Sequence, residues 1–248
     1  MNPFDLTGKR ILVTGASSGI GRACAVCAAE LGATVVLTGR RQEALDETLA
    51  QCAGSGHITI AGDITSNEFV RQLAEGAGKI DGLVHAAGIA PMCPVGMLNE
   101  GDVESVMRTN YYSFLELMKY YSKNKFRNGS LSVVAVSSVS AESGWSGGAA
   151  YCGSKGALSA SVRALAMELA SKRVRINAVC PSNIKTPLYE AGALDMNDEA
   201  SLKELIKKQP LGLGEPEQVA WPVCFLLSDA ASFVTGVNLP VDGGYLAQ

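Results

Sequence analysis

The 248-residue sequence is poor in the residues that metal sites and nucleic-acid interfaces need. Its only histidines, His57 and His85, are far apart, and no histidine, cysteine and acidic residues cluster with the spacing of zinc ligands. The 21 basic and 24 acidic residues leave a net charge of −3, so no excess positive charge is available for nucleic acid or an anionic membrane. We therefore expect no metal, no nucleic-acid partner and no membrane partner.

The sequence also lacks long apolar runs and an ordered cysteine pattern. No run reaches the ~20 apolar residues of a membrane helix, and residues 1–8 contain neither the charged nor the apolar region of a secretion signal. The seven cysteines are odd in number and scattered, which argues against disulfides. Cys24 and Cys27 form a C-x-x-C that could be redox-active, but their alanine-rich surroundings favour small buried side chains. These absences predict a cytoplasmic protein with free thiols.

What the sequence does contain is a regular alternation of short β-branched runs and longer helical patterns. Predicted strands are 10–13, 34–37, 57–61, 82–85, 131–136, 174–179 and 237–240. Predicted helices are 19–31, 41–51, 66–76, 99–122, 151–171 and 216–228, with a further one within 188–207. Several strands are continuously apolar, as parallel strands covered on both faces are. The alternation predicts an α/β fold with a doubly wound parallel sheet, in one domain over 1–248.

The first strand runs into a glycine-rich turn, Thr14-Gly-Ala-Ser-Ser-Gly-Ile-Gly21, which opens a helix. Gly15 would allow the tight turn, Gly19 would let the backbone approach a diphosphate, and Gly21 would permit close packing of helix and strand. The helix amino terminus offers free N–H groups and a positive dipole end to the anion. A glycine turn alone is weak evidence, but its place between strand and helix predicts a dinucleotide site.

The T-G-x-x-x-G-x-G spacing resembles that of the short-chain dehydrogenase/reductase family, and the resemblance extends over nearly the whole chain. The further matching residues are Asp63-Ile64, Asn110, Ser138, Tyr151-Cys-Gly-Ser-Lys155, Asn177-Ala-Val-Cys-Pro181, Thr186 and Val241-Asp-Gly-Gly244. Within the family, the chain looks most like 3-oxoacyl-acyl-carrier-protein reductases. The resemblance implies a Rossmann fold with a seven-stranded parallel sheet and an NAD(P)-dependent oxidoreductase acting on a ketone or secondary alcohol.

The end of the second strand bears on the choice of cofactor. An NAD site usually has an acid here, whereas this chain has Arg40 and Arg41. Arg40 offers a planar guanidinium to a 2′-phosphate, although it could also be a solvated surface residue. Against NADP stands Ser18, since many NADP-preferring relatives have a basic residue in the glycine loop. We expect NADP(H), with NAD(H) as the alternative.

The resemblance assigns further cofactor contacts. They are Gly15, Ser17, Ser18, Gly19, Ile20, Gly21, Arg41, Asp63, Ile64, Ala87, Gly88, Tyr151, Lys155, Pro181, Ile184 and Thr186. Two sites depart from the family pattern: His85-Ala-Ala-Gly88 replaces Asn-Asn-Ala-Gly, and Ser182 replaces a glycine. The first departure removes side chains that usually brace the backbone, and the second lowers conformational freedom.

Four residues are predicted to carry the chemistry. Tyr151 and Lys155 could be a surface pair one helical turn apart, but Ser138 follows a strand at the edge where α/β ligands bind. An ordinary tyrosine has a pKa near ~10, which a lysine charge and an oxidised nicotinamide would lower. By resemblance, Tyr151 exchanges the proton, Ser138 polarises the substrate oxygen, Lys155 also binds the ribose, and Asn110 supports a proton-relaying water. Ser137 is the rival for the serine role.

The substrate is a small ketone or alcohol whose identity the motifs do not settle. We expect a lid at about 187–212, with Ser138, Ser140, Trp145, Tyr151 and Tyr189 lining the pocket. A 3-oxoacyl thioester is the first candidate, and a basic patch could bind its carrier protein, although charged helix ends explain the same residues. That patch would comprise Lys125, Arg127, Lys172 and Arg173. The alternatives are an NAD-dependent alcohol, sugar or hydroxysteroid dehydrogenase and a non-catalytic dinucleotide-binding regulator, which would not need all four catalytic residues.

The sequence also bears on assembly. By resemblance, helices 99–122 and 151–171 form an interface between subunits, and small residues on the second helix would allow close approach. Strand 237–240 could make a second contact and give a homotetramer rather than a homodimer. The alternative is a monomer whose alanine-rich helix packs only on its own sheet.

Overall fold

The structure is a computed structural model that describes residues 2–190, 203 and 207–248. Its frame is a sheet of seven parallel strands in the order β3-β2-β1-β4-β5-β6-β7. The strands are β1 Arg10–Thr14, β2 Thr34–Gly39, β3 Ile58–Ala61, β4 Ile80–His85, β5 Arg127–Val136, β6 Val174–Pro181 and β7 Asn238–Val241. The order reverses between β1 and β4, so the predicted doubly wound Rossmann fold is confirmed.

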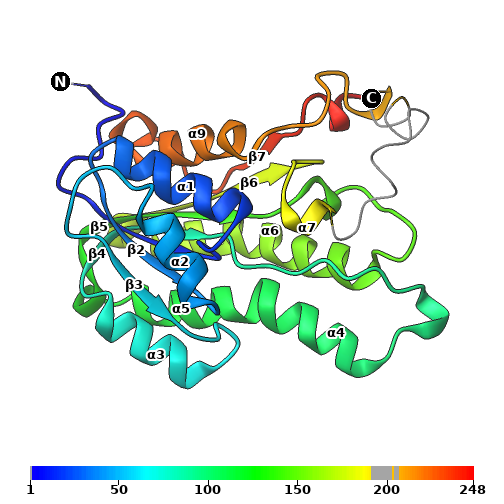
Figure 1. Ribbon diagram of the computed structural model, residues 1–248, viewed down its shortest axis with the longest axis horizontal. Helices are drawn as coiled ribbons and strands as arrows, with labels where there is room; N and C mark the ends of the chain where they lie inside the picture. Colours follow the sequence, from blue (N-terminus) through cyan, green and yellow to red (C-terminus); the bar gives the residue numbers. More distant parts are fainter. Residues whose placement is uncertain (1, 191–202, 204–206) are drawn as a thin grey trace.

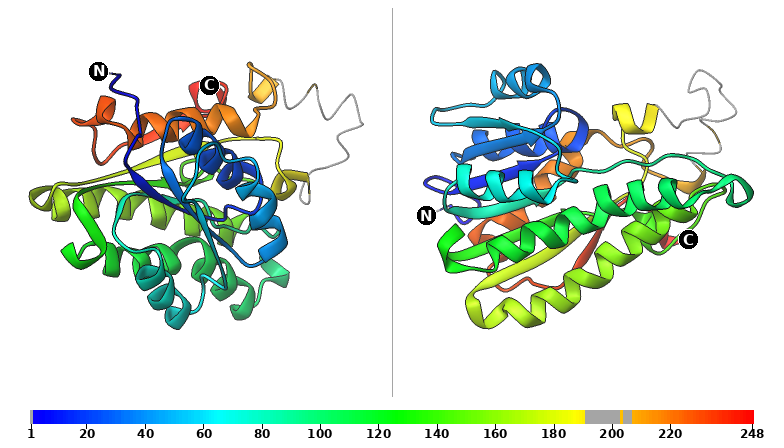
Figure 2. Two further views of the ribbon diagram at one scale, coloured as in Figure 1. Left: turned by 60° about the vertical axis from the view of Figure 1, so that its left-hand side comes forward. Right: turned by 90° about the horizontal axis from the view of Figure 1, so that it is seen from below.

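Helices cover both faces of this sheet (Figures 1 and 2). One face carries α1 Gly19–Glu30, α2 Gln42–Leu49 and α9 Pro216–Leu227. The other carries α3 Asn67–Gly76, α4 Glu100–Met107, α5 Ser113–Tyr121 and α6 Ala149–Leu169. A short helix, α7 Pro187–Glu190, follows β6. This helix begins the predicted lid at about 187–212 and overlaps the helix expected within 188–207. Most residues of these two predicted segments lie outside the described part of the chain.

The predicted helix over 99–122 is not continuous. After α4, a π-helical turn spans Arg108–Tyr112, where the Ser113 N–H donates to the Arg108 carbonyl five residues earlier, and α5 follows. Such a turn inserts one residue into a helix and is common at functional sites. It contains Asn110, one of the four residues predicted to carry the chemistry.

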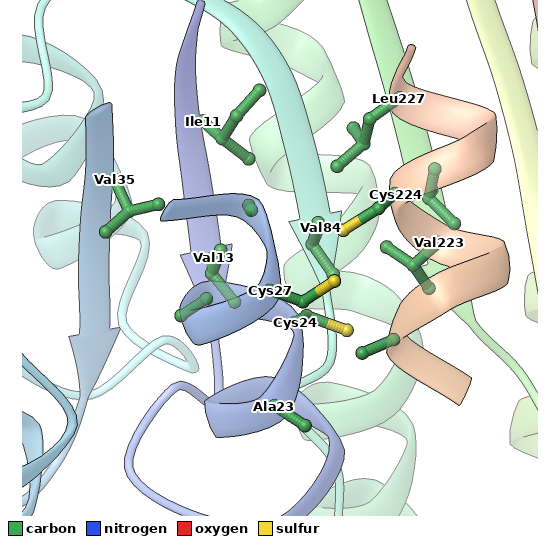
Figure 3. Close-up of a cluster of buried hydrophobic side chains, with 14 of the residues drawn as sticks. Ile11, Val13, Ala23, Cys24, Cys27, Val35, Val84, Val223, Cys224 and Leu227 are labelled. Atoms are coloured by element: carbon green, nitrogen blue, oxygen red, sulfur yellow. The ribbon is translucent and has the colours of Figure 1, made fainter. Parts of the chain in front are cut away.

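The cysteines of the C-x-x-C pattern lie in the core between α1 and α9. Figure 3 shows Cys24 and Cys27 from α1 beside Cys224 from α9, among aliphatic side chains that include Val84. Their exposed fractions are 0%, 9% and 2%, respectively, and all three thiols are free. Burial raises the pKa of Cys24, which keeps its thiol protonated. These side chains therefore pack as small apolar groups, as their alanine-rich surroundings predicted.

In the part of the chain that the structure describes, no helix has the length and apolar character needed to cross a bilayer.

Candidate active site

The glycine loop between β1 and α1 is closed to side chains at each glycine. Gly15 has a φ of +65°, and a Cβ there would lie 2.8 Å from the Ala86 carbonyl group. A Cβ on Gly21 would lie 2.2 Å from the Gly15 carbonyl oxygen. Ser18 precedes α1 and makes no capping hydrogen bond through its side chain. The N–H groups of the first helical turn are therefore available to an anion, as the sequence pattern predicted.

The first residues after β4 are braced by a side chain from β1. The Thr14 hydroxyl oxygen accepts from the N–H groups of Ala86 and Ala87, both at 3.2 Å. With both lone pairs used, the hydroxyl hydrogen is donated to Nδ1 of His85, also at 3.2 Å. The missing family asparagines are thus compensated by a threonine and a histidine.

This pairing also fixes the state of His85, which is fully buried. Burial, with a smaller contribution from the Lys155 charge, lowers the pKa of His85 to about 3, so the imidazole is neutral. Because Nδ1 accepts from Thr14, the ring proton is on Nε2, and a weak contact with the Asn110 backbone only slightly opposes the lowering of the pKa.

A single cavity of about 1130 Å³ lies over the carboxyl ends of the strands. This volume exceeds the upper end of the ~300–1,000 Å³ typical of drug-sized ligands, and it leaves room for a dinucleotide beside a small substrate. The predicted cofactor residues that line it are Gly15, Ser17, Ser18, Gly19, Ile20, Gly21, Arg40, Arg41, Asp63, Ile64, Ala87, Gly88, Tyr151, Lys155, Pro181, Ile184 and Thr186. The predicted substrate residues that line it are Ser138, Ser140, Trp145, Tyr151 and Tyr189.

Arg40 and Asp63 both line the part of the cavity that the sequence analysis assigned to the adenosine half of the cofactor. Arg40 is exposed, and its charge contributes to lowering the pKa of Asp63. The larger cause is Thr65, whose N–H and hydroxyl donate to Asp63 Oδ1 at 2.9 and 2.8 Å. The carboxylate is therefore ionised and held in place, and the guanidinium of Arg40 forms no ion pair among the described residues.

At the other end of the cavity, α6 presents Tyr151 and Lys155 to Ser138, which lies two residues after the end of β5. The Lys155 ammonium is buried, donates to the Val136 carbonyl at 2.8 Å, and lies 5.7 Å from the centre of the Tyr151 ring. Burial lowers the pKa of Lys155 to about 8, so the ammonium is still the main form at pH 7. One of its N–H groups is used by Val136, which leaves two for a ligand.

The pKa of Tyr151 differs from the sequence-based expectation. Burial raises it, while the nearby Ser138 hydroxyl acts in the opposite direction. The sequence analysis predicted that the Lys155 charge would lower the pKa of Tyr151. In the protein without cofactor, the desolvation of the phenol is the largest effect, and the pKa is raised. Tyr151 is therefore a protonated acid at neutral pH.

Ser138 and Ser137 have different surroundings. The Ser140 N–H donates to Ser138 Oγ at 3.1 Å, and the hydroxyl's own contact, to the Pro181 carbonyl, is long at 3.4 Å. Ser137 instead lies within 2.7 Å of the Ser159 hydroxyl and 3.2 Å of the Lys155 carbonyl. The Ser138 hydroxyl therefore lies at Tyr151 with only a long backbone contact of its own, where it can bind a substrate oxygen, whereas Ser137 is engaged by α6.

Asn110 lies behind the cavity wall and is fully buried. Its Oδ1 accepts from the Ile89 N–H at 2.8 Å, and its Nδ2 donates to the Ile89 carbonyl and the Ser154 hydroxyl, both at 2.9 Å. The side chain therefore fixes the segment after β4 against α6.

Several cavity residues were not predicted from the sequence. They are Met92, Thr109, Asn183, Leu188, Lys208 and Tyr245, among others. Leu188 and Lys208 lie within the predicted lid at about 187–212 but were not singled out there, and Tyr245 lies in the tail that follows β7. The available signal for Tyr245 was its nearness in sequence to the Val241–Gly244 motif, whereas Lys208 has no motif nearby.

The predicted basic patch is partly wrong. Arg127 is 3% exposed, because it begins β5 and its guanidinium donates to Asn124. The other three residues, Lys125, Lys172 and Arg173, are exposed. No group of three or more histidine, cysteine or acidic side chains among the described residues could hold a metal ion.

Comparisons with known proteins agree with this geometry. The model of the enoyl-(acyl carrier protein) reductase family matches residues 15–246. The L-xylulose reductase of Bos taurus is 33% identical over 244 residues, 98% of each chain. The 3-oxoacyl-acyl-carrier-protein reductase of Rickettsia conorii is 34% identical over 247 residues, 98% of this chain and 99% of the relative. A solved Agrobacterium tumefaciens structure, described provisionally as a 2-deoxy-D-gluconate 3-dehydrogenase with bound NADP, has a TM-score of 0.91 at 33% identity over 100% of both chains.

The chain belongs to the short-chain dehydrogenase/reductase family of NAD(P)-dependent oxidoreductases. The sequence-based prediction of the family and of its reaction class is thereby confirmed.

Proposed function

We propose that this protein is an NADP(H)-dependent reductase or dehydrogenase that interconverts a ketone and a secondary alcohol. The observation that carries the proposal is that one cavity joins the glycine loop, Arg40, Ser138, Tyr151 and Lys155. The closed glycine contacts and the open first turn of α1 fit a diphosphate, and the exposed Arg40 fits a 2′-phosphate. The NADP bound to the A. tumefaciens relative supports this choice. When bound, the nicotinamide supplies or accepts the hydride.

The side chains divide the remaining work. Tyr151, protonated at neutral pH, gives its proton to the carbonyl oxygen in reduction and takes the hydroxyl proton in oxidation. The Ser138 hydroxyl donates to the same oxygen and orients it. The two free N–H groups of Lys155 hold ribose hydroxyls, and its charge stabilises the tyrosinate that forms in reduction. Asn110 holds the cavity wall through Ile89 and offers its carbonyl to a proton-relaying water.

A 3-oxoacyl thioester and a small sugar-like ketone are the substrate candidates. The buried position of Arg127 weakens the argument for a carrier-protein patch. Ser140, Lys208 and Tyr245, which have hydrogen-bonding side chains, are among the residues that line the cavity, and this favours a hydroxylated substrate. Relatives named for L-xylulose and 2-deoxy-D-gluconate support this second candidate.

The test is NADPH and NADH oxidation against acyl thioesters, keto-sugars and steroid ketones. We expect turnover with NADPH and at least one ketone, and its loss in Tyr151→Phe, with NADPH affinity changed by no more than a few fold because the phenol moves the proton and the ring only packs. Ser138→Ala should lose most activity, whereas the neighbouring Ser137→Ala is the matched control and should retain it. A Tyr151→Phe enzyme with a substantial fraction of wild-type rate contradicts the proposal.

We also propose that the protein is a cytoplasmic homo-oligomer, a tetramer or a dimer. Outward-facing apolar side chains on α5 and α6 and in the π-helical turn support a subunit interface: Met167 is 82% exposed, Tyr112 41% and Leu115 37%. Ala164 lies on the same exposed side of α6 as Met167. The second proposed contact, near β7, is supported by Phe233, whose side chain is fully exposed. The free cysteines fit a reducing compartment.

A further inference from the structure

The buried side chain of Gln209 is the centre of a hydrogen-bond network at the floor of the cavity. It is 1% exposed. Its Nε2 donates to the carbonyls of Asn183 and Gly212 at 3.1 and 2.6 Å. Its Oε1 accepts from the Ser182 hydroxyl at 2.8 Å and from the Asn183 N–H at 3.2 Å, with the Asn183 side-chain amide at 3.3 Å. Every polar atom of the side chain is therefore engaged.

This network uses the serine that replaces a family glycine. The backbone at Ser182 has no positive φ, so the conformational freedom of glycine is not required here. The Ser182 hydroxyl instead lies 2.8 Å from Gln209 Oε1 and 2.9 Å from the Asp242 carbonyl. The substitution thus supplies a hydrogen-bond donor to Gln209.

Three separate segments meet at Gln209: the loop Pro181–Thr186, the turn that follows Gln209, and the chain near Gly243. The Leu211 N–H donates to the Gly243 carbonyl at 3.1 Å. A Cβ on Gly243 would lie 2.8 Å from Gln209 Cγ, so the glutamine side chain occupies the space that the missing side chain leaves.

The loop Pro181–Thr186 has one side on this network and the other on the cavity. Pro181, Ile184 and Thr186 line the cavity, and a Cβ on Gly19 would lie 3.1 Å from the Thr186 side chain. Gln209 contacts both the N–H and the carbonyl of Asn183, as a neighbouring strand would. A backbone bridge to Gly214 also supports the loop, through Gly214 N–H to the Asn183 carbonyl at 3.1 Å and Lys185 N–H to the Gly214 carbonyl at 2.8 Å. Gln209 adds the contacts to the Asn183 N–H and to Ser182, and so helps to place the backbone groups that face a bound cofactor.

We propose that Gln209 is a positioning residue that, with Ser182, holds the Pro181–Thr186 loop in the place where it binds the nicotinamide half of the cofactor. The inference rests on the proposed function, because it requires that the cavity binds NADP(H). The adenosine half is bound far along the cavity by the glycine loop and Arg40, which Gln209 does not contact. A positioning role therefore affects one half of the cofactor, whereas a general loss of folding affects both.

The experiment compares calorimetric binding of NADPH with binding of adenosine 2′,5′-bisphosphate, which lacks the nicotinamide half. Gln209→Met preserves length and removes all the hydrogen bonds. We expect it to weaken NADPH binding by roughly tenfold, or about 1.4 kcal/mol, because the loop loses the contacts that hold it in the binding position. Binding of the adenosine fragment should stay within twofold. Arg40→Ala is the matched control and should weaken the fragment as well as NADPH.

Ser182→Gly serves as a milder variant if Gln209→Met fails to fold, because it removes one hydroxyl and restores the family residue. It should weaken NADPH by about two- to fivefold, again without effect on the fragment. Unchanged NADPH binding in these variants, or an equal loss for both ligands, overturns the positioning role. A wild-type protein that binds neither ligand refutes the proposed function itself, and the inference with it.

Discussion

Acid should destabilise this protein through His85. The imidazole is fully buried and accepts a hydrogen bond from Thr14 at Nδ1, so it cannot take a second proton without losing that bond. Its pKa in the folded chain is about 3, against an ordinary value of 6.5. Between these values the unfolded chain binds a proton that the folded chain does not. Stability is therefore fully present above pH 6.5 and is lost as the pH falls.

The size of the effect follows from the same two values. Each pH unit within this window costs about 1.4 kcal/mol. From pH 7 to pH 4.5 the contribution of His85 to the free energy of unfolding should thus fall by about 2.5 kcal/mol, since the unfolded imidazole is only partly protonated near pH 6.5. This is a large part of the 5–15 kcal/mol that is typical of a folded protein.

The measurement is urea unfolding at both pH values for the wild type and for His85→Asn, at one protein concentration. Asparagine does not titrate, and its amide oxygen can still accept from Thr14. The variant has its own packing defect, but that cost is the same at both pH values and cancels, as do the contributions of other titrating groups. We expect the wild type to lose about 2.5 kcal/mol more than the variant on acidification. Equal losses in the two proteins would refute the assignment of a neutral, buried imidazole.

Three further predictions concern the site and the assembly. Arg40→Asp should weaken NADPH binding by about 2–3 kcal/mol and NADH binding much less, because a charge-assisted contact to the 2′-phosphate is lost; equal weakening in fluorescence titrations would mean that Arg40 is structural. The kcat/KM for ketone reduction should fall as the pH rises through about 8, where Lys155 loses its proton. Lys155→Arg, which stays charged, should not show this fall if it retains activity. Ala164→Glu should shift the sedimenting species toward the 25.8 kDa monomer and lower activity, since α6 also carries Tyr151; a wild type that sediments as a monomer contradicts the proposed interface.

Local sequence patterns were sufficient for the fold and the glycine loop. A side chain at Gly15 would collide with Ala86, just after the adjacent strand β4, and a side chain at Gly21 would collide with Gly15. The spacing of these glycines between strand and helix was enough to identify them. Tyr151 and Lys155 are one helical turn apart, and this places both on the same face of α6. Patterns of this kind are readable because the interacting residues lie close together in the chain.

The features that the sequence did not reveal depend on distant contacts. Arg127 reads as a surface charge, yet it is buried at the start of β5. The raised pKa of Tyr151 follows from the depth of the phenol, which no motif encodes. Lys208 lines the cavity through a turn far from the motifs, and Gln209 is significant only because Ser182, 27 residues away, is its partner.

The π-helical turn at Arg108–Tyr112 has a consequence for the length of this segment. One residue turns an α-helix by about 100°, so the extra residue sets the rotational phase of α4 apart from that of α5. The two phases serve different surfaces: Ser105 of α4 lines the cavity, while Phe114 and Leu117 of α5 are buried in the core. Deleting one residue would join the helices in a single phase and turn α4 by about 100° relative to α5, which would carry Asn110 away from Ile89. This segment must therefore keep its residue count for Asn110 to reach Ile89.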